Sequence, residues 1–137
     1  MDKVNKEKRS EIMSKIKAID TSIEIIVRKY LFLKGFRYRK NDRRYPGTPD
    51  IVLPKHKTII FVNGCFWHGH EGCKHYRLPK SNTEFWEEKI EKNRVRDKAN
   101  IGKLKDKGWK VIVVWECELK RDAGGRLEKL VDEIHAE

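Results

Sequence analysis

The chain has 137 residues, a length that suits one domain with a real hydrophobic core but not two independent domains. Its net charge of +11 favours a polyanionic partner, nucleic acid before an anionic membrane surface. No apolar stretch approaches the roughly 20 residues of a membrane span, and residues 1–20 lack the apolar core of a signal peptide. We therefore expect a protein of the cytoplasm without a membrane partner.

Residues 1–20 carry charges of both signs and few apolar side chains, which predicts a flexible basic arm in front of a single domain over residues 21–137. Thr21 and Glu24 have capping-box spacing, and apolar residues then recur at helical period until Gly35. The segment therefore predicts a helix that faces the core. Residues 36–40 alternate as a strand does, and the loop NDRRYPGTPD follows them.

Two strands, 50–53 and 58–62, are joined by the short turn PKHK and predict an antiparallel hairpin. Counting back from the turn places Leu53 opposite Thr58 and Asp50 opposite Phe61. Asp50 should therefore lie beside the loop that follows the second strand.

The rest of the chain predicts further helices and one more strand. Ser81 and Glu84 suggest a capping box for a long charged helix over residues 83–107, which Gly108 ends. The stretch WKVIVVW is apolar enough for a strand buried on both faces, and a short amphipathic helix with Leu127 and Ile134 closes the chain.

The loop FVNGCFWHGHEGC contains potential metal ligands. Its C-x4-H-x2-C spacing, completed by a later cysteine at the end of the buried strand, is typical of a closed structural zinc site, and an odd count of three cysteines argues against disulfides. The alternative is a set of buried reduced cysteines with a surface histidine. His68 and His75 are alternative ligands. The expected zinc ligands are Cys65, His70, Cys73 and Cys117.

Asp50, Asn63 and His68 form a second set of polar residues at the same end of the hairpin. A carboxylate at a strand start in a basic protein suits Mg²⁺ near a phosphate, although Asp is also common in turns that contain proline. A histidine imidazole titrates near neutral pH and suits a general base, although a lone histidine such as His68 is more often a solvated loop residue. The convergence of these side chains predicts a catalytic site.

Large aromatic residues occur among polar ones, at Phe66 and Trp67 in the loop and at Phe85 and Trp86 at the start of the long helix. Such side chains can wedge between base pairs, or they can form a small satellite core under the loop. Basic side chains would supply phosphate contacts or simply be solvated charges; those considered are Arg43, Arg44, Arg94 and Arg96.

The segments PGTPDIVL, FVNGCFWHGH, TEFWEEKI and WKVIVVWECEL, in this order, resemble the very short patch repair endonucleases, which nick DNA at thymine-guanine mismatches. The similarity runs from about Lys6 to Leu119. It implies a restriction-endonuclease-like α/β fold, with a central mixed sheet flanked by helices and a structural Zn²⁺ site, and it implies Mg²⁺-dependent hydrolysis of a phosphodiester.

The resemblance also assigns roles to residues. It implies Asp50 and the Val62 carbonyl as Mg²⁺ ligands, Glu24 as the helix-borne glutamate and His68 as the catalytic histidine. The zinc ligands fall on the four residues named above, with one extra residue between His70 and Cys73. The DNA-intercalating wedge falls on Phe66, Trp67 and Trp86.

The sequence departs from the family pattern at two adjacent positions. Val62 and Asn63 stand where the best-known members have Thr and His. A backbone carbonyl at Val62 serves a metal as well as one at threonine does, but Asn63 can only orient a water or a phosphate, because an amide does not exchange a proton near neutral pH.

The sequence therefore predicts a monomeric endonuclease that nicks double-stranded DNA at a T:G mismatch, with mismatch-repair proteins as further candidate partners. The rival prediction is a zinc-stabilised DNA-binding module without catalysis.

Overall fold

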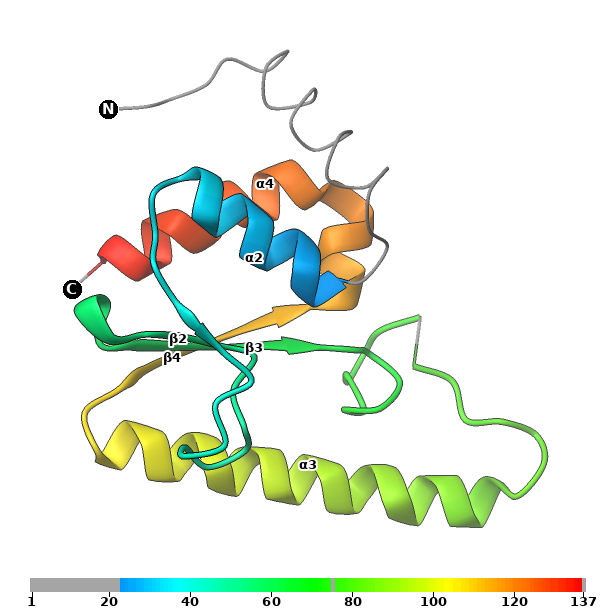
Figure 1. Cartoon of the computed structure of the whole chain (residues 1–137). Helices are drawn as coiled ribbons and strands as arrows, with labels where there is room; N and C mark the ends of the chain where they lie inside the picture. Colours follow the sequence, from blue (N-terminus) through cyan, green and yellow to red (C-terminus); the bar gives the residue numbers. More distant parts are fainter. Residues whose placement is uncertain (1–22, 75, 137) are drawn as a thin grey trace.

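The computed structural model describes residues 23–74 and 76–136. In this part of the chain, a four-stranded sheet in the order β1-β2-β3-β4 lies between α2 and α4 on one face and α3 on the other (Figure 1). The predicted arm and the cap residue Thr21 fall outside the described residues. None of the helices described here is both long and apolar enough to cross a membrane.

The first described helix, α2 (Ile23–Leu33), confirms the helix predicted from the apolar periodicity. Its buried residues Ile26, Val27, Tyr30 and Leu31 recur at helical spacing and face the core. Gly35 ends the helix with φ of 92°, a left-handed conformation that glycine adopts without strain, and the Phe36 amide then donates to the Leu31 carbonyl at 3.0 Å.

The predicted hairpin is present with the predicted register. β2 (Ile51–Leu53) pairs antiparallel with β3 (Thr58–Asn63), and Leu53 lies opposite Thr58. The connection is a single turn of 3-10 helix, η1 (Pro54–His56), followed by Lys57 in the left-handed region. β1 (Arg39–Lys40) is shorter than predicted, since only these two residues pair with β2.

α3 (Thr83–Asp106) connects β3 to its parallel neighbour β4 (Lys110–Trp115). Parallel strands need such a crossover, and it brings their carboxyl ends to the same edge of the sheet. Asn63 at the end of β3 is paired with Trp115 at the end of β4. The residues that follow each strand therefore meet at this edge.

α3 begins at Thr83 as predicted, but its predicted cap is wrong, and the closing helix is longer than predicted. Ser81 and Glu84 do not cap α3: the N-cap is Asn82, in the left-handed conformation, and the Thr83 hydroxyl donates to the Pro79 carbonyl at 2.8 Å. α4 (Glu116–His135) is longer than the predicted closing helix and begins directly after β4. Cys117 therefore lies in the first turn of α4, not at the end of the strand.

The early start of α4 has a local cause. The Glu118 carboxylate accepts the Trp115 amide at 2.8 Å, which satisfies a backbone donor at the helix start. The helix then kinks at Asp122, whose φ and ψ of −156° and 82° are not helical and whose carboxylate accepts the Gly125 amide at 3.0 Å.

Both faces of the sheet are covered, as the apolar composition of β4 predicts. Ile60, Val62, Ile112 and Val114 belong to the larger core beneath α2 and α4. The alternate residues Ile59, Phe61 and Val111 pack with Leu104 of α3 in a smaller core on the other face. The sheet is thus a rigid support whose β3 and β4 ends carry the site described next.

Candidate active site and metal centre

Asp50 directly precedes β2 and contacts the end of β3. Its Oδ2 atom accepts a hydrogen bond from the Val62 amide at 2.7 Å, so the two ends of the hairpin are joined by a side chain. Burial raises the pKa of Asp50, and the nearby charge of Glu24 raises it further, while the Val62 amide, His68 and Arg28 act in the opposite direction.

The predicted catalytic residues line one cavity of about 840 Å³. Asp50 and Val62 reach it from the hairpin, Glu24 from α2 and His68 from the loop after β3. Asn63 also lines it and is almost fully buried, with 6% of its surface exposed. Residues that are far apart in the sequence thus meet at a single opening, which Asp97 and Arg96 of α3 border on the opposite side.

Asp97 is a site residue that the sequence analysis missed. Its Oδ2 atom lies 2.5 Å from Nδ1 of His68, and the two side chains are 26% and 29% exposed. A carboxylate that accepts the Nδ1 proton fixes the tautomer in which Nε2 is an acceptor. The sequence offered little signal for Asp97, because it is one of many charged residues on a long polar helix.

The oxygen atoms around this cavity fit a hard divalent cation. Asp50 supplies a carboxylate, and among the described residues no donor is bonded to its second oxygen, Oδ1. Glu24 and Val62 line the same cavity. Carboxylate and carbonyl oxygens are ligands that Mg²⁺ prefers, with water completing its coordination.

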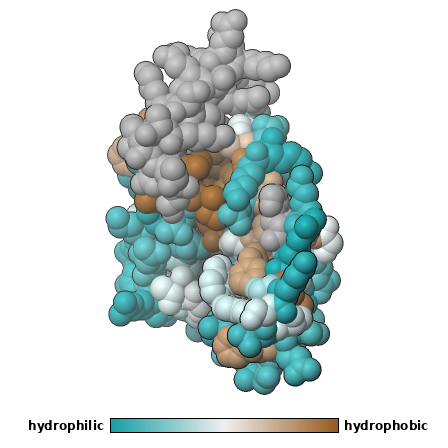
Figure 2. All heavy atoms as spheres, turned by 90° about the vertical axis from the view of Figure 1, so that its right-hand side faces the viewer, coloured by the Kyte–Doolittle hydropathy of each residue, from teal (hydrophilic) through white to brown (hydrophobic). Residues whose placement is uncertain are grey.

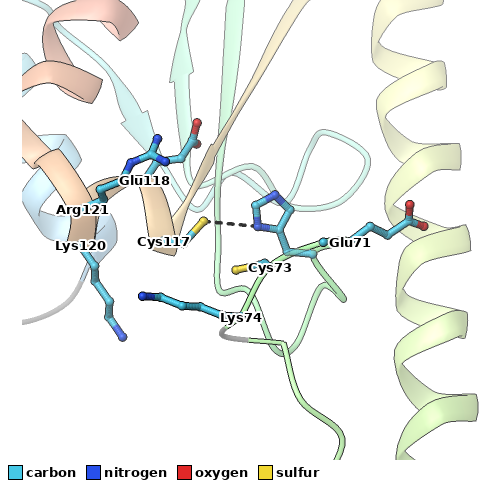
Figure 3. A pocket seen from close by; sticks show the side chains of 9 residues that line it. Glu71, Cys73, Lys74, Cys117, Glu118, Lys120 and Arg121 are labelled. Carbon is cyan, nitrogen blue, oxygen red and sulfur yellow. Dashed lines mark hydrogen bonds between the residues drawn. The ribbon is translucent and has the colours of Figure 1, made fainter.

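The predicted zinc ligands also come together. One ligand atom from each of four residues, Cys65, His70, Cys73 and Cys117, lies within 4.8 Å of all the others. The Nδ1 atom of His70 is 3.6 Å from the Cys65 sulfur and 3.4 Å from the Cys117 sulfur. In Figure 3 the sulfur atoms of Cys73 and Cys117 approach the same space from the loop and from α4. This cluster could hold a metal ion.

The surroundings of the cluster suit a metal ion that binds sulfur and nitrogen ligands in a tetrahedral arrangement. The Cys117 amide donates to the Cys65 sulfur at 3.3 Å, and the His70 ring stacks flat on Trp115 at 3.9 Å. Burial raises the pKa of Cys65 to about 12, so without a cation its thiol keeps its proton. A bound metal reverses this preference, because thiolates are its ligands.

Of the two alternative zinc ligands, only His68 belongs to the described residues. His68 is bonded to Asp97 instead, and His75 lies outside the described residues. Three cysteines and one histidine are a common ligand set for structural zinc.

The expected wedge residues form one aromatic group at the amino-terminal end of α3. Phe66 and Trp67 contact each other at 5.2 Å between ring centres, and each lies 5.7 Å from the ring of Trp86. Trp67 is 50% exposed and Phe85 is 58% exposed, so the group is not a closed satellite core. Figure 2 shows this end of the molecule, where hydrophobic patches are interspersed with hydrophilic side chains.

Three of the arginines considered for phosphate binding have partners within the protein. Arg44 forms a fork with Asp42, at 2.7 Å and 3.0 Å, and this contact lowers the pKa of Asp42 to about 2. Arg94 donates from Nε to the Gly69 carbonyl at 2.8 Å. Arg96 donates from NH2 to Oδ1 of Asn93 at 2.8 Å and also lines the cavity.

The mixed sheet between helical layers, with an acidic residue beside the ends of its central strands, is a restriction-endonuclease-like fold. Comparison with known proteins gives the family. The model of the DNA mismatch endonuclease Vsr family matches residues 1–75.

Individual relatives extend the match over nearly the whole chain. A type II nicking enzyme of Neisseria meningitidis serogroup A, V.NmeAIP, is 58% identical over 129 residues, which cover 93% of this chain and 91% of that protein. The DNA mismatch endonuclease Vsr of Escherichia coli K12 is 43% identical over 133 residues, covering 97% and 81%. The nicking enzyme V.XorIIP of Xanthomonas oryzae is also 43% identical, over 134 residues. The chain belongs to the Vsr family of DNA mismatch endonucleases.

Proposed function

We propose that the protein nicks one strand of duplex DNA at a thymine-guanine mismatch by Mg²⁺-dependent hydrolysis of a phosphodiester, the step that initiates very short patch repair. The main support is the cavity in which Asp50 lies near a histidine paired with an aspartate, His68 and Asp97. A buried carboxylate, an oriented imidazole and a strongly basic surface suit hydrolysis of a polyanion.

In this proposal Asp50 and the Val62 carbonyl hold Mg²⁺, which when bound neutralises charge on the scissile phosphate. Asp97 holds the Nδ1 proton of His68, so that Nε2 can take a proton from the attacking water. Glu24 orders water in the cavity. Asn63 orients a water or a phosphate oxygen through its amide and takes no part in the transfer of a proton.

The cluster of three cysteines and one histidine, and the aromatic group, have supporting roles. Structural Zn²⁺ at Cys65, His70, Cys73 and Cys117 fixes the loop that carries His68. The same loop directs Phe66 and Trp67, together with Trp86, at the base stack, where a mismatched step opens at a lower cost than a paired one.

The enzyme would act as a monomer in the cytoplasm on nucleoid DNA, with mismatch-repair proteins as candidate partners. A second function, mismatch binding with little or no catalysis, is favoured by one observation: Asn63 stands where the best-known members have a histidine.

A nicking assay separates the two. A duplex with one T:G mismatch, labelled differently on each strand, is incubated with the protein, with and without added Mg²⁺. A matched duplex serves as the substrate control, and Asp50→Asn as the protein control. We expect a nick in one strand of the mismatched duplex that requires both Mg²⁺ and Asp50. Tight mismatch binding without any nick would leave the binding module as the function.

A further inference from the structure

The segment that carries His68 is bound to one turn of α3 at three points. Asn93 donates from its side-chain amide to the Trp67 carbonyl at 2.9 Å, and Arg94 donates from Nε to the Gly69 carbonyl at 2.8 Å. Between these carbonyls, the His68 ring contacts Asp97. The carbonyls of the residues before and after His68 therefore both accept hydrogen bonds from the helix that also orients its ring.

Arg94 is itself held by two further contacts. Its guanidinium lies 5.0 Å from the centre of the Tyr76 ring, and its NH1 atom is 3.3 Å from the Glu91 carboxylate. The side chain is only 26% exposed. These contacts fix the direction of the Nε–H group towards the loop, and they leave Arg94 poorly suited to be a mobile phosphate contact.

Gly69 makes this approach possible. A Cβ atom at residue 69 would lie 2.4 Å from Nε of Arg94 and 2.6 Å from Cγ2 of the fully buried Ile90. The residue also has φ of 57°, which side chains disfavour. Gly69 and Arg94 are thus sterically matched, since the arginine lies where a side chain at residue 69 would otherwise be.

We propose that Arg94 is a positioning residue for His68, acting through its hydrogen bond to the Gly69 carbonyl. The inference rests on the proposed role of His68 in proton transfer. Without this bond, the Gly69 carbonyl is released from α3, and the imidazole of the preceding residue loses part of the restraint that holds it at reacting distance. Small displacements of a catalytic group lower reaction rates strongly, about 100-fold for 1 Å.

Two substitutions separate the hydrogen bond from the charge. Arg94→Gln places an amide nitrogen at the same number of bonds from the backbone as Nε and keeps a donor without the charge. Arg94→Met has a similar length and no donor. At saturating mismatched DNA we expect the single-turnover rate of Arg94→Met to fall about 10-fold. This loss is smaller than the roughly 100-fold cost of a 1 Å displacement, because the other contacts of the loop remain. Arg94→Gln should stay within about 3-fold of the parent, and DNA affinity should be unchanged in both.

Lys92→Met is the matched control, because it removes a cation of the same helix whose partner among the described residues is the exposed Glu88. Equal losses in Arg94→Met and Arg94→Gln, with weaker DNA binding, would make Arg94 a phosphate contact. Loss of bound metal in Arg94→Met would assign the residue to the metal centre. Full activity of Arg94→Met would show that the bond is dispensable. Each of these results overturns the proposal.

A double-mutant cycle distinguishes failure of this proposal from failure of the proposed function. In a His68→Ala background, Arg94→Met should reduce the residual rate less than 2-fold, roughly the error of additivity. A full 10-fold loss there would show that Arg94 does not act through His68. If His68→Ala alone left nicking intact, the proposed function of His68 would be wrong. NMR of the DNA-free protein tests Arg94 independently of catalysis. Arg94→Met should shift the imidazole resonances of His68, and Arg94→Gln should leave them in place.

Discussion

The carboxyl group of Asp50 has a raised pKa chiefly because it is buried. An acid whose pKa is higher in the folded chain than in the unfolded chain binds protons more tightly when folded. The free energy of unfolding therefore falls as pH rises from the ordinary carboxyl pKa through the raised one. At neutral pH the ionised carboxylate destabilises the fold while it supplies the charge that a cation requires.

Asp50→Asn should accordingly separate stability from activity. The amide keeps an oxygen that can accept the Val62 amide and removes the buried charge, so we expect the melting temperature at pH 7, without added Mg²⁺, to rise by roughly 2–5 °C. Nicking should be lost. Thermal denaturation at pH 7 and at pH 4 checks this, because the difference should shrink when the parent carboxyl is protonated. A lower melting temperature at pH 7 would contradict the electrostatic argument.

His68 and Asn63 line the same cavity but differ in the chemistry that they can perform. His68→Ala should lower the nicking rate by about 100-fold or more at unchanged DNA affinity, the usual scale of general base catalysis. Asn63→Ala should lower it by less than about 10-fold, because an amide only orients its partners. Single-turnover rates and binding titrations on the mismatched duplex measure both. Equal losses would mean that Asn63 has a direct part in the reaction.

The sequence was informative for residues whose neighbours are set by the hairpin. Asp50 and the residues after β3 were expected to meet because the turn at residues 54–57 dictates the register, and they do. Asp97 could not be found in this way, because its distance from His68 depends on how α3 packs beneath the sheet. That packing follows from a few apolar contacts, such as Leu104 and Ile90, on a helix that is otherwise polar.

At the scale of elements, the proposed function places both recognition and catalysis on the loop after β3. Trp67 and His68 are adjacent, and the half-exposed indole of Trp67 lies with Phe66 and Trp86 in one aromatic group. Lys89 adds a positive charge 5.8 Å from the Trp67 ring. A side chain in this position can enter a base stack while its neighbour reaches the phosphate.

Trp67→Ala should weaken the preference for mismatched over matched duplex by about 1–3 kcal/mol, the scale of a stacking contact with a base. Electrostatic binding to any duplex should keep its salt dependence, because that term comes from Lys and Arg. Titrations of both duplexes at two salt concentrations, without Mg²⁺ to prevent cleavage, provide the test. An unchanged preference together with a lower melting temperature would identify the aromatic group as a core.

The elements themselves were predicted unequally. The longer strands and the buried faces of α2 and α4 follow from hydrophobic periodicity, which burial enforces along the whole element. The cap of α3 and the start of α4 do not, because local hydrogen bonds decide them: the Thr83 hydroxyl bonds to a preceding carbonyl, and Glu118 accepts the Trp115 amide. Such contacts compete closely with the capping pattern that the sequence suggested.

For the molecule as a whole, the cluster of three cysteines and one histidine connects the loop after β3 with the first turn of α4. Structural zinc sites contribute folding energy directly. We expect about one zinc per chain in the purified protein, and Cys117→Ala should lose that zinc and much of its thermal stability. Metal analysis and thermal denaturation of the mutant and the parent measure both effects. Full zinc retention in Cys117→Ala would exclude the residue as a ligand.

The parallel pairing of β3 and β4 also has a consequence for how the protein matures. Cys65, His70 and Cys73 follow β3, whereas the fourth candidate ligand follows β4, on the far side of the crossover helix. A chain that is still emerging from the ribosome can therefore offer only an incomplete ligand set, and a cation is released easily from it. Tight uptake must wait until the last strand has joined the sheet. Tight zinc binding would then be a late step of folding, which occurs only in chains whose β4 has paired with β3.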